Sequence, residues 1–108
     1  MAQNFRRFVK NDVGTAAETV FTADSFDAVV GISLANVHTA AINVSAYITS
    51  GGNDLYLIKD APIPVGSSLQ VLDGGAKLVV ENTDVLKVQS DTASSLDAYV
   101  SCVDSIST

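Results

Sequence analysis

The chain has 108 residues, of which 47% are hydrophobic, and a formal net charge of −6. This length suits one domain, and the apolar content is too high for a disordered chain. No apolar run reaches the roughly 18 residues of a membrane-spanning helix. No apolar run follows the arginines near Met1 either, so we expect neither a membrane segment nor a signal peptide.

Charge is distributed unevenly along the sequence. Residues 1–10 hold Arg6, Arg7 and Lys10 without an acid, whereas residues 11–108 hold three lysines and all 12 acids. The acidic body argues against nucleic-acid binding, because phosphate contacts need a basic face. The basic start has two interpretations: an arm that docks on an acidic neighbour such as a second copy, or a first strand with solvated charges.

Turn-forming residues recur about every 8–12 positions, which is the spacing of a β-sandwich or barrel. The sequence between the turns predicts strands at Asn4–Val9, Ala17–Thr22, Phe26–Leu34, Ala41–Thr49, Leu55–Lys59, Leu69–Leu72, Lys77–Glu81, Val85–Gln89 and Leu96–Val103. We therefore predict an all-β, single-domain β-sandwich of about eight short antiparallel strands, with jelly-roll or immunoglobulin-like topology. Residues 11–104 form this domain, 1–10 are the basic arm or first strand, and 105–108 are a loose tail.

Three segments carry the most local information. Ala41–Thr49 alternates strictly, with Ile42, Val44, Ala46 and Ile48 on one face and Asn43, Ser45, Tyr47 and Thr49 on the other. Asp73-Gly74-Gly75 predicts a hairpin that joins Leu69–Leu72 to Lys77–Glu81. Pro62 and Pro64 exclude a central strand and predict an extended edge or crossover, with Ile63 directed inward and a turn at Gly66.

Residues that could carry out chemistry are sparse. Cys102, the single cysteine, falls in an apolar alternation and is interpreted as a buried small residue, so folding needs no oxidising compartment and synthesis in the cytoplasm is expected. His38, the single histidine, is interpreted as an ordinary loop residue. We predict no catalytic residue, no metal ligand set and no cofactor, and hence no enzyme. A weak calcium site between adjacent loops is left open.

Apolar residues on polar strand faces are the better functional signal. Tyr47, Tyr99 and Val103 fall on such faces, and Phe5 and Phe8 flank the two arginines. Aromatic residues and arginine are enriched in interfaces, although both faces of a sandwich commonly carry a few apolar side chains. The predicted oligomer interface consists of Phe5, Arg6, Arg7, Phe8, Lys10, Tyr47 and Tyr99.

Three stretches of the sequence together carry a resemblance to a known family. They are the opening Met1–Phe8 with Val13-Gly14-Thr15, the middle Tyr56–Leu69, and the ending Asp84–Val88 with Ser94–Asp97. In these stretches the chain resembles small virion structural proteins of tailed phages, with cyanophages and other marine phages as the nearest match.

The resemblance implies a non-enzymatic β-sandwich that is present in many copies on the virion. Its place would be the capsid surface as a decoration or cement protein, the neck or collar, or the tail, with capsid decoration slightly favoured. Its partners would be other virion proteins and further copies of itself in a trimer or ring, with neither nucleic acid nor membrane bound. No catalytic residue comes with this family.

A binding module is the alternative function. The loops at Gly51–Asp54 and Asp91–Ser95 would then hold a carbohydrate or a host receptor. The absence of tryptophan and the aromatic content of 6% count against a sugar-binding platform.

Overall fold

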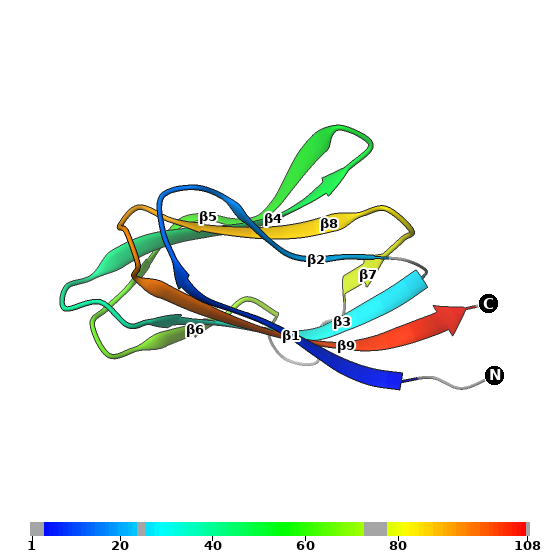
Figure 1. The fold of residues 1–108 in the computed structure, drawn as a ribbon, viewed down its shortest axis with the longest axis horizontal. Helices are drawn as coiled ribbons and strands as arrows, with labels where there is room; N and C mark the ends of the chain where they lie inside the picture. The colour runs from blue at the N-terminus through cyan, green and yellow to red at the C-terminus, as the bar shows by residue number, and fades with distance from the viewer. Residues whose placement is uncertain (1–3, 24–25, 73–77, 108) are drawn as a thin grey trace.

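A computed structural model of the chain describes residues 4–23, 26–72 and 78–107, which form an all-β single domain (Figure 1). Its strands are β1 (Asn4–Val13), β2 (Glu18–Thr22), β3 (Phe26–Asn36), β4 (Ile42–Ser50), β5 (Asn53–Ile63), β6 (Ser68–Gln70), β7 (Leu78–Val80), β8 (Val85–Ser90) and β9 (Leu96–Ser107). The predicted fold class is confirmed. Within the described ranges, no helix has the length and apolar character needed to cross a membrane.

The strands form two antiparallel sheets that pack face to face. Sheet A has the order β1-β9-β3, with β6 and β7 both paired to the free side of β3. Sheet B has the order β2-β8-β4-β5. Since β6 and β7 follow each other along one edge of β3, they act as one interrupted strand. The sandwich then has eight strands in two sheets of four, in the order of a jelly roll.

The core lies between the two sheets and comes from alternate residues of each strand. The alternation predicted for β4 is confirmed, because its four apolar residues are all buried at 5% exposure or less. On β9 the buried residues are Leu96, Ala98, Val100 and Cys102. Full burial of a valine, leucine or isoleucine stabilises a fold by roughly 1.5–3 kcal/mol, so these two central strands supply much of the driving force.

The predicted hairpin between Leu69–Leu72 and Lys77–Glu81 is wrong. β6 pairs with residues 33–35 of β3, and β7 pairs with residues 27–29 of the same strand. The N–H of Val71 also donates to the carbonyl of Ile32 at 2.9 Å, which continues the contact along β3. Turn chemistry is local, whereas the long edge of β3 offers partners to both segments in succession. The turn residues Asp73-Gly74-Gly75 lie outside the described residues.

The predicted edge and crossover around Ile63 are confirmed. β5 is the edge strand of sheet B, and Ile63 at its end is only 1% exposed. The chain then crosses to sheet A through a turn in which the N–H of Ser67 donates to the carbonyl of Pro64 at 3.2 Å. Gly66 adopts a φ of 72° in this turn, a conformation that side chains with a Cβ disfavour.

Both ends of the described chain are paired strands. Residues 4–10 belong to β1, which pairs with β9, so the basic segment is a first strand over these residues. The loose tail predicted for 105–108 is wrong over residues 105–107, because β9 continues to Ser107 opposite Phe26. β3 begins at Phe26 and so offers backbone partners to this polar segment. Thr108 lies outside the described residues.

Asn36 joins the two sheets at one end of the sandwich. Its side chain is 5% exposed, and its Nδ2 donates to the carbonyls of Ala40 at 2.9 Å, Ile63 at 3.0 Å and Pro64 at 3.2 Å. Its Oδ1 accepts the N–H of His38 at 2.8 Å. One buried amide therefore holds the end of β3, the following loop and the crossover from β5.

Candidate assembly surface

Each sheet turns one face to the core and the other to solvent, and each outer face has a tyrosine on a central strand. Tyr99 of β9 lies between Val9 of β1 and Ser33 of β3 on the outer face of sheet A. Tyr47 of β4 lies between Tyr56 of β5 and Lys87 of β8 on the outer face of sheet B. Tyr99 is 46% exposed and Tyr47 is 6% exposed. The two faces therefore differ in what covers them.

The exposed surface on sheet A is called the open face here. Its members are alternate residues of β1, β9 and β3 that share the outer side of the sheet, namely Arg7, Val9, Ser33, Ala35, Asp97, Tyr99 and Ser101. Val9 is 50% exposed, so an aliphatic and an aromatic side chain lie next to each other in solvent. Contiguous exposed apolar groups of this kind mark interaction surfaces more often than single ones do.

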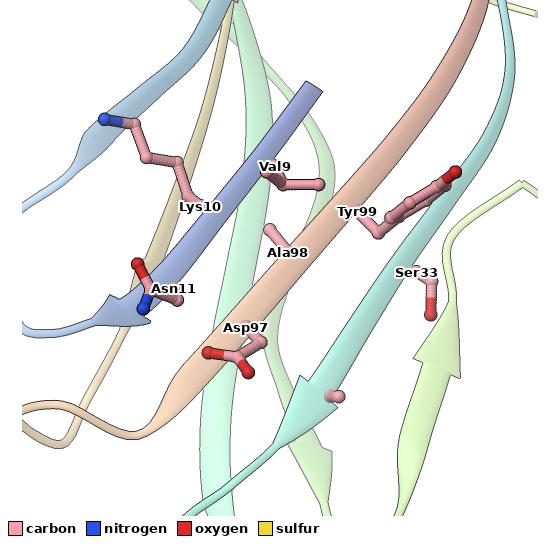
Figure 2. Close-up of a pocket in the computed structure, with 8 residues that line it drawn as sticks. Val9, Lys10, Asn11, Ser33, Asp97, Ala98 and Tyr99 are labelled. Carbon is pink, nitrogen blue, oxygen red and sulfur yellow. The ribbon is translucent and has the colours of Figure 1, made fainter. Parts of the chain in front are cut away.

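A shallow hollow of about 470 Å³ lies on the open face (Figure 2). Val9, Ala98 and Tyr99 line it from β1 and β9, and Ser33 and Ala35 line it from β3. The hollow exists because the side chains that β3 presents here are small. Figure 2 shows the Lys10 side chain, which also belongs to this lining, extending away from the Tyr99 side.

A second hollow of about 390 Å³ lies on the other side of Tyr99. Its lining includes Arg6, Arg7 and Ser101 together with Tyr99 itself. Tyr99 lines both hollows and so separates them. Asp97 lines the first hollow, together with Lys10 on its far side, and Arg7 lines the second. Among the residues of the open face, Asp97 therefore marks an acidic end and Arg7 a basic end.

On the corresponding surface of sheet B, Tyr47 is covered by the chain itself, while Tyr56 beside it stays 44% exposed. The rings of Tyr47 and Tyr56 lie 4.8 Å apart between centroids, and the Lys59 ammonium lies 5.0 Å from the Tyr56 ring centre. Burial raises the pKa of the Tyr47 hydroxyl, and the nearby Asp54 carboxylate raises it further. This group of Tyr47, Tyr56 and Lys59 is called the covered face below.

Two of the predicted interface residues are not exposed as expected. Tyr47 is buried because β5 pairs with β4 in a register that places Tyr56 directly beside it. Phe8 is half-buried and stacks on Phe21 of β2, with ring centroids 4.6 Å apart. The expected exposure of Tyr47 is therefore wrong and Phe8 is only partly exposed, while the place of both residues in an interface stays a prediction.

The other predicted interface residues have mixed surroundings. Arg7 is exposed on the open face and Lys10 is half-buried. The Arg6 guanidinium lies 5.3 Å from the centre of the Phe8 ring, a cation–π arrangement that also covers part of that ring. The backbone of Phe5 pairs opposite Val103, and its side chain lies outside the described residues.

Several exposed apolar residues were not identified by the sequence analysis, among them Val9, Leu55 and Tyr56. Val9 belongs to the open face, and Leu55 and Tyr56 are 58% and 44% exposed near the tip of the β4–β5 hairpin, which extends beyond the rest of sheet B (Figure 1). The signal for Val9 is its register opposite Tyr99, which no local pattern contains.

The buried polar side chains of the described residues take part in the hydrogen bonding of the fold. Among the described residues, no three histidines, cysteines or carboxylates gather as a metal site. Every buried polar side-chain atom in this part of the chain has a hydrogen-bond partner. Ser90 and Ser95, for example, share a hydrogen bond of 2.6 Å that closes the loop before β9.

Comparison with known proteins gives a likeness of fold. No family model matches the sequence, and no curated protein matches it. A solved structure of Bacillus endospore appendages, described as a novel family of disulfide-linked pili, is similar with a TM-score of 0.55. The alignment covers 94% of this chain and 84% of that chain at 13% sequence identity, so the likeness concerns the fold.

Proposed function

We propose that this protein is a non-enzymatic structural subunit of a tailed-phage virion, present in many copies. It attaches to the capsid, the neck or collar, or the tail, with capsid decoration slightly favoured. The open face carries this proposal. A small sandwich that covers Tyr47 with its own chain leaves Tyr99 and Val9 in solvent, which is the state expected of a surface that another molecule covers.

Two further observations support the proposal. The sequence stretches that resemble virion structural proteins include Tyr56–Leu69, which here forms the edge strand and the crossover of the sandwich. The similar fold belongs to a structure of pili, which are assemblies. Those pili are described as disulfide-linked, whereas the single cysteine of this chain, Cys102, is 1% exposed in the core. Contacts between copies of this chain are therefore proposed to be non-covalent.

The proposal includes the setting of the protein. Synthesis takes place in the cytoplasm of the host bacterium and the finished protein resides in the virion. Its partners are other virion proteins and further copies of itself, as a trimer or ring. The acidic body, with 12 acids against six bases in the whole chain, disfavours a role on nucleic acid.

Purified particles of a phage that encodes this chain provide the test. Quantitative mass spectrometry of gradient-purified virions is expected to find the protein in many copies per particle, and deletion of its gene is expected to remove that signal. Recovery of the protein only from the soluble lysate would contradict the proposal. Particles that lack it, remain intact, and fail only to adsorb to cells would instead favour the receptor-binding module.

A further inference from the structure

The two outer faces of the sandwich differ in how a central-strand tyrosine is packed. On the covered face, the central-strand Tyr47 packs against the ring of Tyr56 from the neighbouring strand, and the Lys59 ammonium lies over that second ring. On the open face, Tyr99 has the small Ser33 on one side and the exposed Val9 on the other. The fold therefore leaves Tyr99 without the packing that it gives to Tyr47.

We infer that the open face binds the open face of a second copy of this chain around a two-fold axis near Tyr99. Tyr99 of each copy enters the hollow beside Tyr99 of the other. Arg7 of each copy faces Asp97 of the other. This inference rests on the proposed function, because it names the partner of the surface that carries it.

Charge complementarity favours a second copy as the occupant. Arg7 lies opposite Ser101, which is four residues along β9 from Asp97, with Tyr99 midway between them. At about 3.4 Å per residue, the basic and acidic positions of one copy are roughly 13 Å apart, which is too far for an ion pair. A two-fold axis that lies between the two faces and runs across the strands near Tyr99 reverses the order of these positions. The basic end of one copy then meets the acidic end of the other.

Shape favours the same arrangement. The hollow of about 470 Å³ lies next to an exposed tyrosine, so the open face carries both a projection and a recess. Two copies related by a two-fold axis exchange these features, because each recess receives the projection of the partner. Ser33 and Ala35 keep the recess open, and a larger side chain at either position would fill it.

The area of the open face indicates how tightly two copies are expected to bind. Three strands about 4.8 Å apart and about seven residues long present a flat area on the order of 350 Å² per copy. Stable complexes bury about 800 Å² per partner, so the contact is expected to be weak for two free copies. Many copies held on one lattice would strengthen it through their high effective concentration. A two-fold contact closes at two copies, so a trimer or ring needs a second, different contact.

Reversing the charges at Arg7 and Asp97 in the full chain tests the inference. Sedimentation velocity from about 10 μM to about 1 mM is expected to show reversible dimers of the wild type. Arg7→Asp and Asp97→Arg are each expected to weaken the dimer at least about tenfold, and the double variant is expected to recover most of that loss. Since the two positions are too distant to pair within one copy, recovery reports a contact between copies.

Three controls keep the result specific. Lys87→Asp makes the same change of net charge as Arg7→Asp, but on sheet B, and is expected to leave the dimer unchanged. Asp97→Asn removes the charge but keeps an oxygen that accepts the Asp12 N–H, which Asp97 accepts at 3.0 Å in the native chain. Urea midpoints of all variants establish that loss of the dimer is separate from loss of the fold.

Several outcomes would overturn the inference. A wild type that stays monomeric over the whole concentration range would do so. A double variant that dimerises no more strongly than the two single variants would do so as well. A Tyr99→Lys variant that fails to join particles while the wild type never dimerises would assign the open face to another virion protein. In each case the presence of the chain in purified virions is a separate measurement, so the proposed function stands or falls independently.

Discussion

The two outer faces of this sandwich treat the same kind of residue in opposite ways. Tyr47 and Tyr99 both occupy central strands and both point away from the core, yet one is 6% exposed and the other is 46% exposed. The difference arises from the neighbouring strand. β5 places Tyr56 beside Tyr47, whereas β3 places Ser33 beside Tyr99.

This contrast indicates where the chain packs an outer-face tyrosine itself and where it leaves one in solvent. On sheet B, a long edge strand folds back and contributes an aromatic ring and a lysine to the surface. On sheet A, the central strand is flanked by small residues and by an exposed valine. Mutations that remove the packing on one face or the other test the contrast directly.

The largest effect is expected from truncating the covered tyrosine. Tyr47→Ala should lower the free energy of unfolding by about 3 kcal/mol, because it removes a buried ring that packs on Tyr56. Tyr99→Ala is the matched variant on the open face and should cost less than about 1 kcal/mol. Urea denaturation of both variants gives the comparison, and equal losses would show that the two faces do not differ in the isolated chain.

The next effect concerns the residue that ties the two sheets together. Asn36→Ala should cost about 2 kcal/mol, because three carbonyls and one N–H lose their bonds to the buried amide. Asn43→Ala, at an exposed position on β4, serves as the control and should be near neutral. Hydrogen exchange should locate the loss at the end of β3 and the crossover; a uniform loss over both sheets would contradict this role.

A smaller effect is expected from uncovering Tyr47 without removing it. Tyr56→Ala should cost about 1 kcal/mol, since it deletes an aromatic pair at the edge of sheet B. It should also lower the pKa of Tyr47 toward its ordinary value, because burial is the main cause of the upward shift. Ultraviolet titration of the tyrosinate signal measures this change, and an unaltered titration of Tyr47 would mean that Tyr56 does not cover it.

The smallest effect is the pH dependence of stability. The raised pKa of Tyr47 means that the folded state holds the phenol proton more tightly than the unfolded state does. That contribution is complete below the unfolded pKa of about 10 and is lost as the pH rises through the higher folded value. Tyr47→Phe should therefore flatten the loss of stability above about pH 10 relative to the native chain. Urea denaturation of both proteins at a series of alkaline pH values is the measurement, and identical slopes would remove Tyr47 as the source.

Local patterns in the sequence predict much of this fold and less of its surface. The alternation over residues 41–49 predicts β4 and its inward face, because a strand with one buried side needs a period of two. The prolines at 62 and 64 predict an edge, because neither can donate to a neighbouring strand. Both inferences require only the residues themselves, and both agree with the structure.

The errors share a physical cause, which is that pairing and coverage are not local. Asp73-Gly74-Gly75 predicts a hairpin, but both flanking strands pair with β3, whose residues 33–35 lie opposite residues 68–70 and whose residues 27–29 lie opposite residues 78–80. Alternation places Tyr47 on the outer face correctly and cannot reveal that Tyr56 covers it. Val9 can be identified as part of an exposed surface only from its register opposite Tyr99. A surface made from three strands has no signature within any one of them.

The interrupted edge of sheet A has a consequence for colloidal behaviour. An exposed, continuous edge strand is a template on which other chains can add strands, and crowding on a particle would favour such growth. β6 and β7 have three residues each, so this edge offers two short templates in place of one long one. The opposite edge, β1, is continuous but carries Arg6, Arg7 and Lys10, which repel a second β1. The molecule is thus guarded against amyloid-like extension at both margins of the sheet whose flat side is exposed.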